Sequence, residues 1–251
     1  MAEVLGKVGN LTWIELKLFL REPLSLAFVF AYPLIVIVVL GGFFRDAPVE
    51  VGPLAGFDMM ESYVPAYIGL VIASVGLLGL PVHLAGYREL GVLRRFRASG
   101  LPPWALFGSQ GAVTLAMAVA GGAVLVVTGM AAFDTGLPQS VAGVAAAFML
   151  TVFCFTAIGT LLGAVMPNAR STLGFGLILW FVMMMLSGTD GPLPAMPGWL
   201  QTVAEALPLT HAVRALQYPW VGLGWYWEEN LVLLGAGAVA WLLAARVIRW
   251  E

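Results

Sequence analysis

The composition of this chain of 251 residues excludes an ordinary water-soluble domain, because 61% of its residues are hydrophobic and only 10% are charged. Soluble domains have about 45–50% apolar and about 25% charged residues. The mean hydropathy of +0.94 instead predicts a protein embedded in a bilayer. Because 12 basic and 14 acidic residues nearly cancel, the sequence argues against a nucleic-acid partner. We expect one transmembrane domain across residues 1–251.

Six apolar segments of the chain are long enough to form membrane-spanning helices, each of which needs about 20 residues. The predicted spans are residues 24–44, 62–84, 104–132, 141–166, 171–187 and 229–247. Pro33 predicts a kink in the first span, and Pro81 marks the expected end of the second, because proline lacks the amide hydrogen that a helix interior uses. The predicted fold class is an all-α integral membrane protein with six transmembrane helices.

The basic residues predict the orientation of these spans. If the N-terminus is cytoplasmic, only Arg45 and Arg214 of the 12 basic residues lie outside. The other ten are Lys7, Lys17, Arg21, Arg88, Arg94, Arg95, Arg97, Arg170, Arg246 and Arg249. Because cytoplasmic loops carry an excess of Lys and Arg, we expect both termini on the cytoplasmic side of a prokaryotic plasma membrane.

The segment before the first span has the pattern of a helix that lies in the membrane plane. Over residues 11–21, Trp13, Leu16 and Leu20 fall on one stripe, with charged residues beside it. A proline directly before the first span then interrupts the helix. This pattern predicts an N-terminal interfacial elbow helix, and the alternative is a plain cytoplasmic start of the first span.

Between the fifth and sixth spans, residues 190–229 are apolar but interrupted by five prolines. Neither residues 197–207 nor residues 209–217 can cross a membrane, so we predict a re-entrant helical hairpin that dips into the outer leaflet. Its candidate gate residues are Glu205, Pro208, His211 and Arg214. Because a charge at that depth needs a partner or water, we expect Arg214 to face a wet outward vestibule, or to pair with Glu205 or an outer-loop acid.

The loop between the second and third spans holds four basic residues within ten positions, 88–97. On a helix, Leu90, Leu93 and either Phe96 or Arg97 approach one face. Such an amphipathic helix would press against a cytoplasmic protein or anionic lipid headgroups. The alternative is a loop whose charge only sets the topology.

This loop resembles the cytoplasmic loop of the type 2 ATP-binding-cassette (ABC) exporter permeases. The matching residues are Arg88, Glu89, Gly91, Leu93, Arg94, Arg95 and Arg97, followed by Ala98, Ser99, Leu101 and Pro102. A second resemblance is the segment LPLTHAVRAL at residues 207–216, and together with the six spans the resemblance covers nearly the whole chain. One departure is Gly100, where many relatives place proline directly after the small residue.

The resemblance implies a coupling helix that docks onto a separate ATPase subunit. The residues it assigns to this contact are Tyr87, Arg88, Glu89, Leu90, Gly91, Leu93, Arg94, Arg95, Phe96 and Arg97. It also implies that two permease subunits, identical or related, form the pathway, and that the hairpin closes its exit. The chain itself lacks a Walker motif, since its only Gly-Lys pair, Gly6-Lys7, is followed by Val8. We therefore expect no cofactor on this chain, with ATP and Mg²⁺ bound by the partner subunit.

The interior of the spans favours an apolar cargo. Apart from Glu229 and Arg246 at the ends of the last span, His83 is the only acidic or basic residue within them, whereas ion-coupled carriers usually place acids in the membrane. The resulting pathway suits an amphipathic or lipid-like substrate moved outward. Gly159 and Gly163 form a small-xxx-small pair that predicts close helix packing. Cys154 lies in an apolar run and is expected to be buried.

Two other classes of function remain as alternatives. An intramembrane enzyme would need a nucleophile, but Ser187 with His211 lacks the GxSxG turn, so no catalytic residue is assigned. No metal-ligand motif occurs, because the only two histidines are far apart in the chain. The second alternative is a membrane subunit with a role other than transport.

Overall fold

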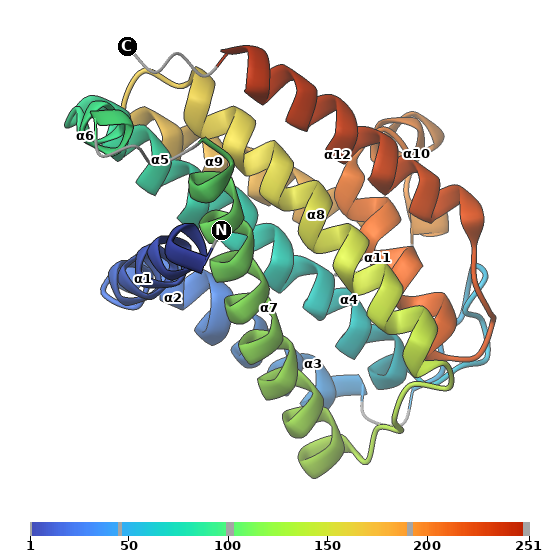
Figure 1. The fold of residues 1–251 in the computed structure, drawn as a ribbon. Coiled ribbons are helices and arrows are strands. Elements are labelled where there is room, and N and C mark those ends of the chain that lie inside the picture. Colours follow the sequence, from blue (N-terminus) through green and yellow to red (C-terminus); the bar gives the residue numbers. More distant parts are fainter. Residues whose placement is uncertain (1, 45–46, 99–102, 190–192, 248–251) are drawn as a thin grey trace.

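The structure of the chain is a computed structural model that describes residues 2–44, 47–98, 103–189 and 193–247. This part is nearly all helical (Figure 1). Its elements are α1 Ala2–Phe19, α2 Pro23–Leu26, η1 Ala27–Ala31, α3 Tyr32–Phe44, α4 Met59–Ser74, η2 Val75–Gly79, α5 Leu80–Glu89, α6 Val92–Ala98, α7 Pro103–Phe133, α8 Val141–Val165, α9 Ala169–Leu186, η3 Leu193–Ala195, α10 Gly198–Ala204, α11 Pro208–Trp220 and α12 Trp227–Val247.

Six helices in the described part are long and apolar enough to cross a membrane, which confirms the predicted number of spans. They are Pro23–Phe44, Met59–Glu89, Gly108–Phe133, Val141–Val165, Ala169–Leu186 and Trp227–Val247. Most of their ends agree with the sequence prediction to within a few residues. The main exception is the second span, which is longer than expected at both ends.

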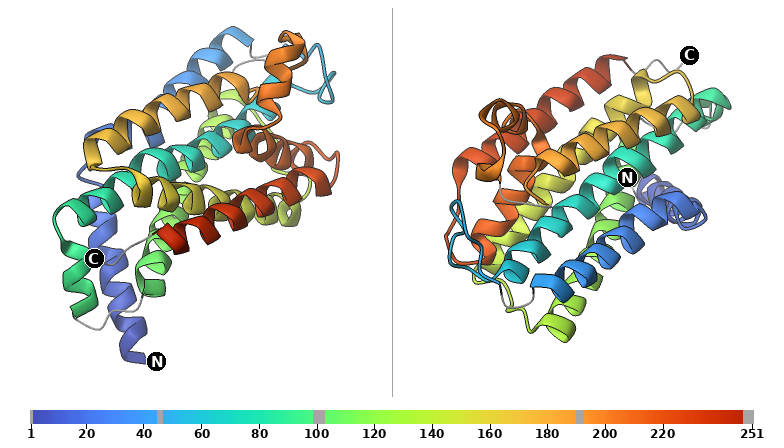
Figure 2. Two further views of the ribbon diagram at one scale, coloured as in Figure 1. Left: turned by 90° about the horizontal axis from the view of Figure 1, so that it is seen from above. Right: turned by 180° about the vertical axis from the view of Figure 1, so that it is seen from behind.

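The second span is the central helix of the bundle. It consists of α4, η2 and α5, and 89% of its most apolar stretch is buried, against 28–44% for the other five spans. Helices α7 and α8 lie in front of it in Figure 1, and α9 runs along it in the view from behind (Figure 2, right). Side chains such as Tyr67, Leu70 and Ile72 have no exposed surface, so this helix organises the core.

The expectation that Pro81 ends the second span is wrong, because the helix continues to Glu89. A π-helical turn, η2, ends two residues before this proline, and a second π-helical turn, η1, ends two residues before Pro33 in the first span. Proline removes one hydrogen bond and its ring clashes with the carbonyl four residues earlier. The wider π turn accommodates both defects, and such turns are a known cause of irregularity inside long helices.

Glycines allow α8 to approach the central helix closely, as the small-xxx-small pattern predicts. A Cβ atom on Gly159 would overlap the carbonyl oxygen of Gly76, and one on Gly163 would lie 2.8 Å from the carbonyl oxygen of Pro81. Any larger side chain would therefore push the two backbones apart. Cys154 lies on the same helix and is fully buried, as expected.

Helix α1 is longer than the predicted elbow, and its buried face differs from the predicted stripe. Among the side chains of α1 that the structure describes, Leu11, Glu15 and Phe19 are buried. Trp13 and Leu20, in contrast, are 58% and 51% exposed. Leu16 lies between these two faces and is partly buried. An apolar stripe read from the sequence alone does not indicate whether that face of the helix contacts protein or lipid, since both are apolar.

The bundle has two distinct ends (Figure 1). Helices α1 and α6 and the C-terminal end of α12 lie at one end, which we call the inner end. The loop of residues 47–58, α10 and the turn before α12 lie at the opposite, outer end. Helix α11 is buried along almost its whole length against α4, α8 and α12, so it is part of the protein core.

Candidate functional site

The inner end contains the segment that was predicted as one coupling helix. The structure divides this segment: α5 ends at Glu89, the chain turns at Leu90 and Gly91, and α6 begins at Val92. Gly91 has a positive φ of 67°, a conformation that glycine adopts without strain. The prediction that Leu90 and Leu93 share one helical face is therefore wrong, because the turn at Gly91 separates them.

These two leucines have opposite environments. Leu90 is 74% exposed, whereas Leu93 is 3% exposed. Leu93 packs against Leu11 of α1, Leu84 of α5 and the partly buried Tyr87. This small cluster fixes α6 to α1 and α5, so Leu93 stabilises the fold and is not accessible to another protein in this structure.

Arg88 and Glu89 hold the turn between α8 and α9. The guanidinium of Arg88 donates hydrogen bonds of 2.9 Å to the backbone carbonyls of Gly163 and Met166, at the C-terminal end of α8. A carboxylate oxygen of Glu89 accepts a hydrogen bond of 3.3 Å from the backbone amide of Ala169, the first residue of α9. Each charge thus matches the helix dipole it meets.

The remaining predicted contact residues differ in accessibility. Arg94 and Arg95 are exposed on α6, and Leu90, in the turn before this helix, is exposed as well. The side chains of Phe96 and Arg97 lie outside the described part of the structure, as do residues 99–102 with the loop exit. An exposed patch of Leu90, Arg94 and Arg95 therefore remains on the inner end, and we call it the α6 patch.

Two acidic side chains lie where α1 and the first span meet the bundle. Burial raises the pKa of the Glu15 carboxyl to about 8, although polar contacts from Ser109 and Gln110 oppose this shift. Burial also acts to raise the pKa of Glu22, but the hydrogen bond and charge of His83 outweigh it, and this pKa is lowered. Glu22 lies 3.1 Å from Nε2 of His83, so the histidine within the second span has a partner.

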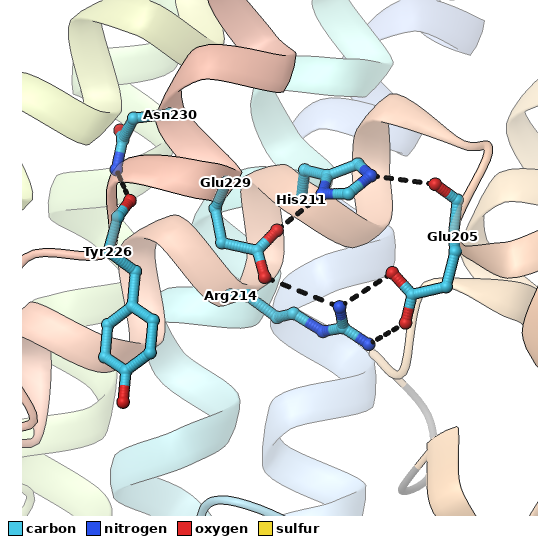
Figure 3. Close-up of polar contacts among 6 residues, drawn as sticks. All are labelled: Glu205, His211, Arg214, Tyr226, Glu229 and Asn230. Carbon is cyan, nitrogen blue, oxygen red and sulfur yellow. Dashed lines mark hydrogen bonds and ion pairs between the residues drawn. The ribbon is translucent and has the colours of Figure 1, made fainter.

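The outer end holds a compact cluster of four ionisable side chains, which we call the outer cluster: Glu205, His211, Arg214 and Glu229 (Figure 3). Arg214 contacts both carboxylate oxygens of Glu205, at 2.9 and 2.6 Å, and one oxygen of Glu229 at 3.4 Å. The other oxygen of Glu229 lies 2.5 Å from Nδ1 of His211. The expected pairing of Arg214 with Glu205 is confirmed.

The cluster joins three helices and perturbs the ionisation of its members. Glu205 follows α10, His211 and Arg214 belong to α11, and Glu229 lies in the first turn of α12. The hydrogen bond from Arg214 lowers the pKa of Glu205 despite partial burial. Burial acts to lower the pKa of His211 and of Arg214, but contacts with the two carboxylates outweigh it, and both values are raised.

A cavity of about 570 Å³ lies beside the outer cluster. It is bounded by the loop of residues 47–54, the ends of α3, α4 and α9, and one face of α11. Its wall is largely apolar, with Leu54, Tyr63 and Val213 among the lining residues, and Arg214 and Gln217 add polar groups. Arg214 therefore both pairs with acids and borders an outward cavity, the two environments that the sequence predicted as alternatives.

The geometry gives His211 no contact with the candidate nucleophile Ser187. Both ring nitrogens of His211 contact other partners, the Glu229 carboxylate and the backbone carbonyl of Glu205. Ser187 donates its hydroxyl hydrogen bond to the backbone carbonyl of Met184 and lies next to Thr189. This arrangement does not favour the intramembrane enzyme.

Six apolar helices with charged groups concentrated at two opposite ends define a multi-pass membrane protein. A family model described as ABC-2 type transporter matches residues 7–219, and the chain belongs to this family. It is therefore a transmembrane permease subunit of an ABC exporter. In this family the ATPase activity belongs to a separate subunit.

Curated relatives agree with this assignment. The chain is 28% identical over 240 residues to the daunorubicin resistance ABC transporter permease protein DrrB1 of Streptomyces coeruleorubidus, covering 91% of this chain and 80% of the relative. It is 24% identical over 232 residues to the putative transport permease ycf38 of Porphyra purpurea, covering 89% and 78%. The corresponding permease of Pyropia yezoensis is 23% identical over 224 residues, covering 87% and 75%.

Sequence reasoning missed two buried acids, Glu15 and Glu229. Glu15 was placed only beside the apolar stripe of α1, and Glu229 was one of two adjacent glutamates at the start of the last span. Glu228 is exposed and Glu229 is buried, and only the rotation of α12 distinguishes them. No local signal separates the two residues.

Proposed function

We propose that this permease subunit exports an amphipathic or lipid-like molecule, driven by ATP hydrolysis in a separate subunit that docks at the inner end. The observation that carries this proposal is the distribution of charge. Between their ends, the spans hold one ionisable side chain, His83, and it is paired with Glu22. Such an interior gives a coupling ion no binding site, so the energy must come from elsewhere.

The ATPase contact would use the α6 patch. Leu90, Arg94 and Arg95 are exposed, and the combination of an apolar side chain with two guanidinium groups suits a groove with an acidic rim. Arg88 and Glu89 would act indirectly, because they connect the base of this patch to the ends of α8 and α9. A push on α6 would thereby reach two spans at once.

The substrate class follows from the apolar lining and from the relative. A largely apolar cavity with a few polar groups suits a molecule that has both apolar and polar parts. The relative in Streptomyces coeruleorubidus is named for resistance to daunorubicin. For this chain we propose the broader class, an amphipathic or lipid-like compound, with the outer hairpin of α10 and α11 closing the exit.

The remaining features of the proposal concern assembly and orientation. A second permease subunit, identical or related, would complete the pathway, with ATP and Mg²⁺ bound by the ATPase subunits. The inner end would be cytoplasmic, because Lys17, Arg21 and most arginines lie there and a large share of the acids lies at the outer end. The exposed Trp13 and Leu20 of α1 would then contact the headgroup region of a plasma membrane as an elbow helix.

The test replaces the exposed leucine of the α6 patch. Leu90→Asp would bury an unpaired charge in the ATPase groove, which costs several kcal/mol, so we expect at least a tenfold loss of association. The matched control is Leu137→Asp, because Leu137 is 65% exposed at the outer end. Both variants should insert and melt like the parent protein. Undiminished co-purification of the ATPase with Leu90→Asp would contradict this docking site.

A further inference from the structure

Both ring nitrogens of His211 face hydrogen-bond acceptors. Nδ1 lies 2.5 Å from a carboxylate oxygen of Glu229, and Nε2 lies 2.9 Å from the backbone carbonyl oxygen of Glu205. Figure 3 shows the ring held between these two groups. The residue is buried, with 8% of its surface exposed, so water has little access to either nitrogen.

This geometry restricts the protonation state of the ring. A neutral imidazole has one N–H donor and one nitrogen lone pair, and only the imidazolium form has two donors. With an ionised Glu229, a neutral His211 would direct its lone pair at an oxygen lone pair across one of the two short contacts. A proton must therefore lie in each contact, on the ring or on the Glu229 carboxyl.

The neighbouring charges favour placing the proton on the ring. Arg214 contacts the second oxygen of Glu229 at 3.4 Å and forms a two-oxygen contact with Glu205, which stabilises both carboxylates in their ionised form. With His211 protonated, the cluster has two positive and two negative groups. With His211 neutral, it would hold one net negative charge in a largely buried position.

We propose that the His211 imidazole is a proton-binding site of the outer end, doubly protonated at neutral pH, and that loss of its proton weakens the connection between the turn after α10 and α12, which Arg214 then bridges alone. The contacts of this one ring join Glu205, which follows α10, to Glu229 of α12. Loss of either N–H breaks one side of the connection. Because α11 also borders the outer cavity, the same event changes the wall of that cavity.

The other titratable groups on the surrounding helices do not determine the protonation of His211. Helix α11 itself adds Arg214 and Tyr218, while α8 contains no acidic or basic residue and α9 carries only Arg170, at the inner end. On α4, the Glu61 carboxylate lies close to Gly136, in the loop between α7 and α8. On α12, Glu228 is exposed. Glu205 and Glu229 are thus the acids that set the charge of His211.

The pH dependence has a definite sign. Contacts with Glu229 and Glu205 raise the pKa of His211 above its ordinary 6.5, against the opposing effect of burial. A histidine whose pKa is raised by folding stabilises the folded state fully at low pH, and this contribution is lost as the pH rises through the raised value. The connection between α10 and α12 should therefore weaken on the alkaline side of 6.5.

Nitrogen NMR of the histidine ring tests the charge state without any transport assay. The chain has only two histidines, so His83→Gln leaves one signal, and His211→Gln identifies it. In lipid nanodiscs we expect both ring nitrogens of His211 to carry a proton at pH 7, with a midpoint above 6.5. Glu229→Gln should shift that midpoint to lower pH.

A neutral ring at pH 7, or a midpoint that Glu229→Gln does not move, would overturn the proposal. If Glu229→Gln does not fold, the charge state measured with native Glu229 decides alone. A neutral ring beside a protonated Glu229 also counts against the assignment, because the proton would then belong to the carboxyl.

Cysteine labelling tests the structural consequence. Ala204 is fully buried beside Glu205, and the native Cys154 is buried and gives the background. The maleimide labelling rate of Ala204→Cys should rise more steeply with pH when His211 is present than in an Ala204→Cys, His211→Gln double variant. The two proteins share the same thiol environment on α10, so equal slopes would show that the proton does not hold the turn.

Discussion

The two ends of the bundle hold their charged side chains in different ways. At the inner end, Arg88 and Glu89 bind backbone groups at the ends of α8 and α9. At the outer end, Arg214 lies between Glu205 and Glu229, so charges bind one another. Backbone dipoles do not titrate, whereas a cluster of ionisable groups does. The contacts of Arg88 with backbone carbonyls therefore do not depend on protonation, whereas the strength of the outer cluster does.

The largest expected effect comes from removing the cation at the outer end. Arg214→Met would remove the cation that contacts both Glu205 and Glu229, so that two carboxylates share His211 alone, and breaking such a pair beside the buried Glu229 costs about 3 kcal/mol. We expect a clearly lower melting temperature in detergent, partly restored at acidic pH, where carboxylates become protonated. Arg95→Met is the control, because Arg95 is exposed and should change stability by less than about 0.5 kcal/mol.

Removing the cation at the inner end should cost less. Arg88→Met would leave two carbonyl groups of α8 without their charged donor, a loss of about 2 kcal/mol. No carboxylate depends on Arg88 alone, so the change in melting temperature should be nearly independent of pH. Arg94→Met is the control on the same end. A larger loss for Arg88→Met than for Arg214→Met would reverse the comparison between the two ends.

Sequence reasoning predicted the spans well because their length and composition are local properties. Pro33 and Pro81 both interrupt apolar runs, but the sequence could not show that a π-helical turn would accommodate each proline. The small residues Gly159 and Gly163 were correctly predicted to allow close packing, since only the absence of a side chain permits that approach.

The candidate site was less predictable, because it depends on which way each helix is rotated. One glycine, Gly91, separated Leu90 from Leu93 and reversed the expected burial of the second. The pairing of Arg214 with Glu205 was foreseeable from the need of a buried charge for a partner. The contact between Arg214 and Glu229 was not foreseeable, because Glu229 belongs to another helix, α12, which follows α11 after a turn.

The smallest expected effect concerns Glu15, a buried acid at the inner end. None of its described contacts is with a cation. Burial raises its pKa from 4.5 to about 8, so the folded protein binds a proton that the unfolded chain releases. Stability therefore falls as the pH rises from 4.5 to about 8 and is constant above that range. Glu15→Gln keeps the size and the polar contacts but cannot ionise.

The stability of the variant should equal that of the parent protein at pH 5 and exceed it at pH 8.5, because the parent must then keep a charged carboxylate in an apolar environment. After allowance for solvent screening, we expect a gain of roughly 1 to 2 kcal/mol, read as a higher melting temperature. Glu50→Gln is the control, because Glu50 is exposed. A pH-independent difference between Glu15→Gln and the parent would mean that burial does not raise the pKa of Glu15, and that its carboxylate stays ionised in the folded protein over this range.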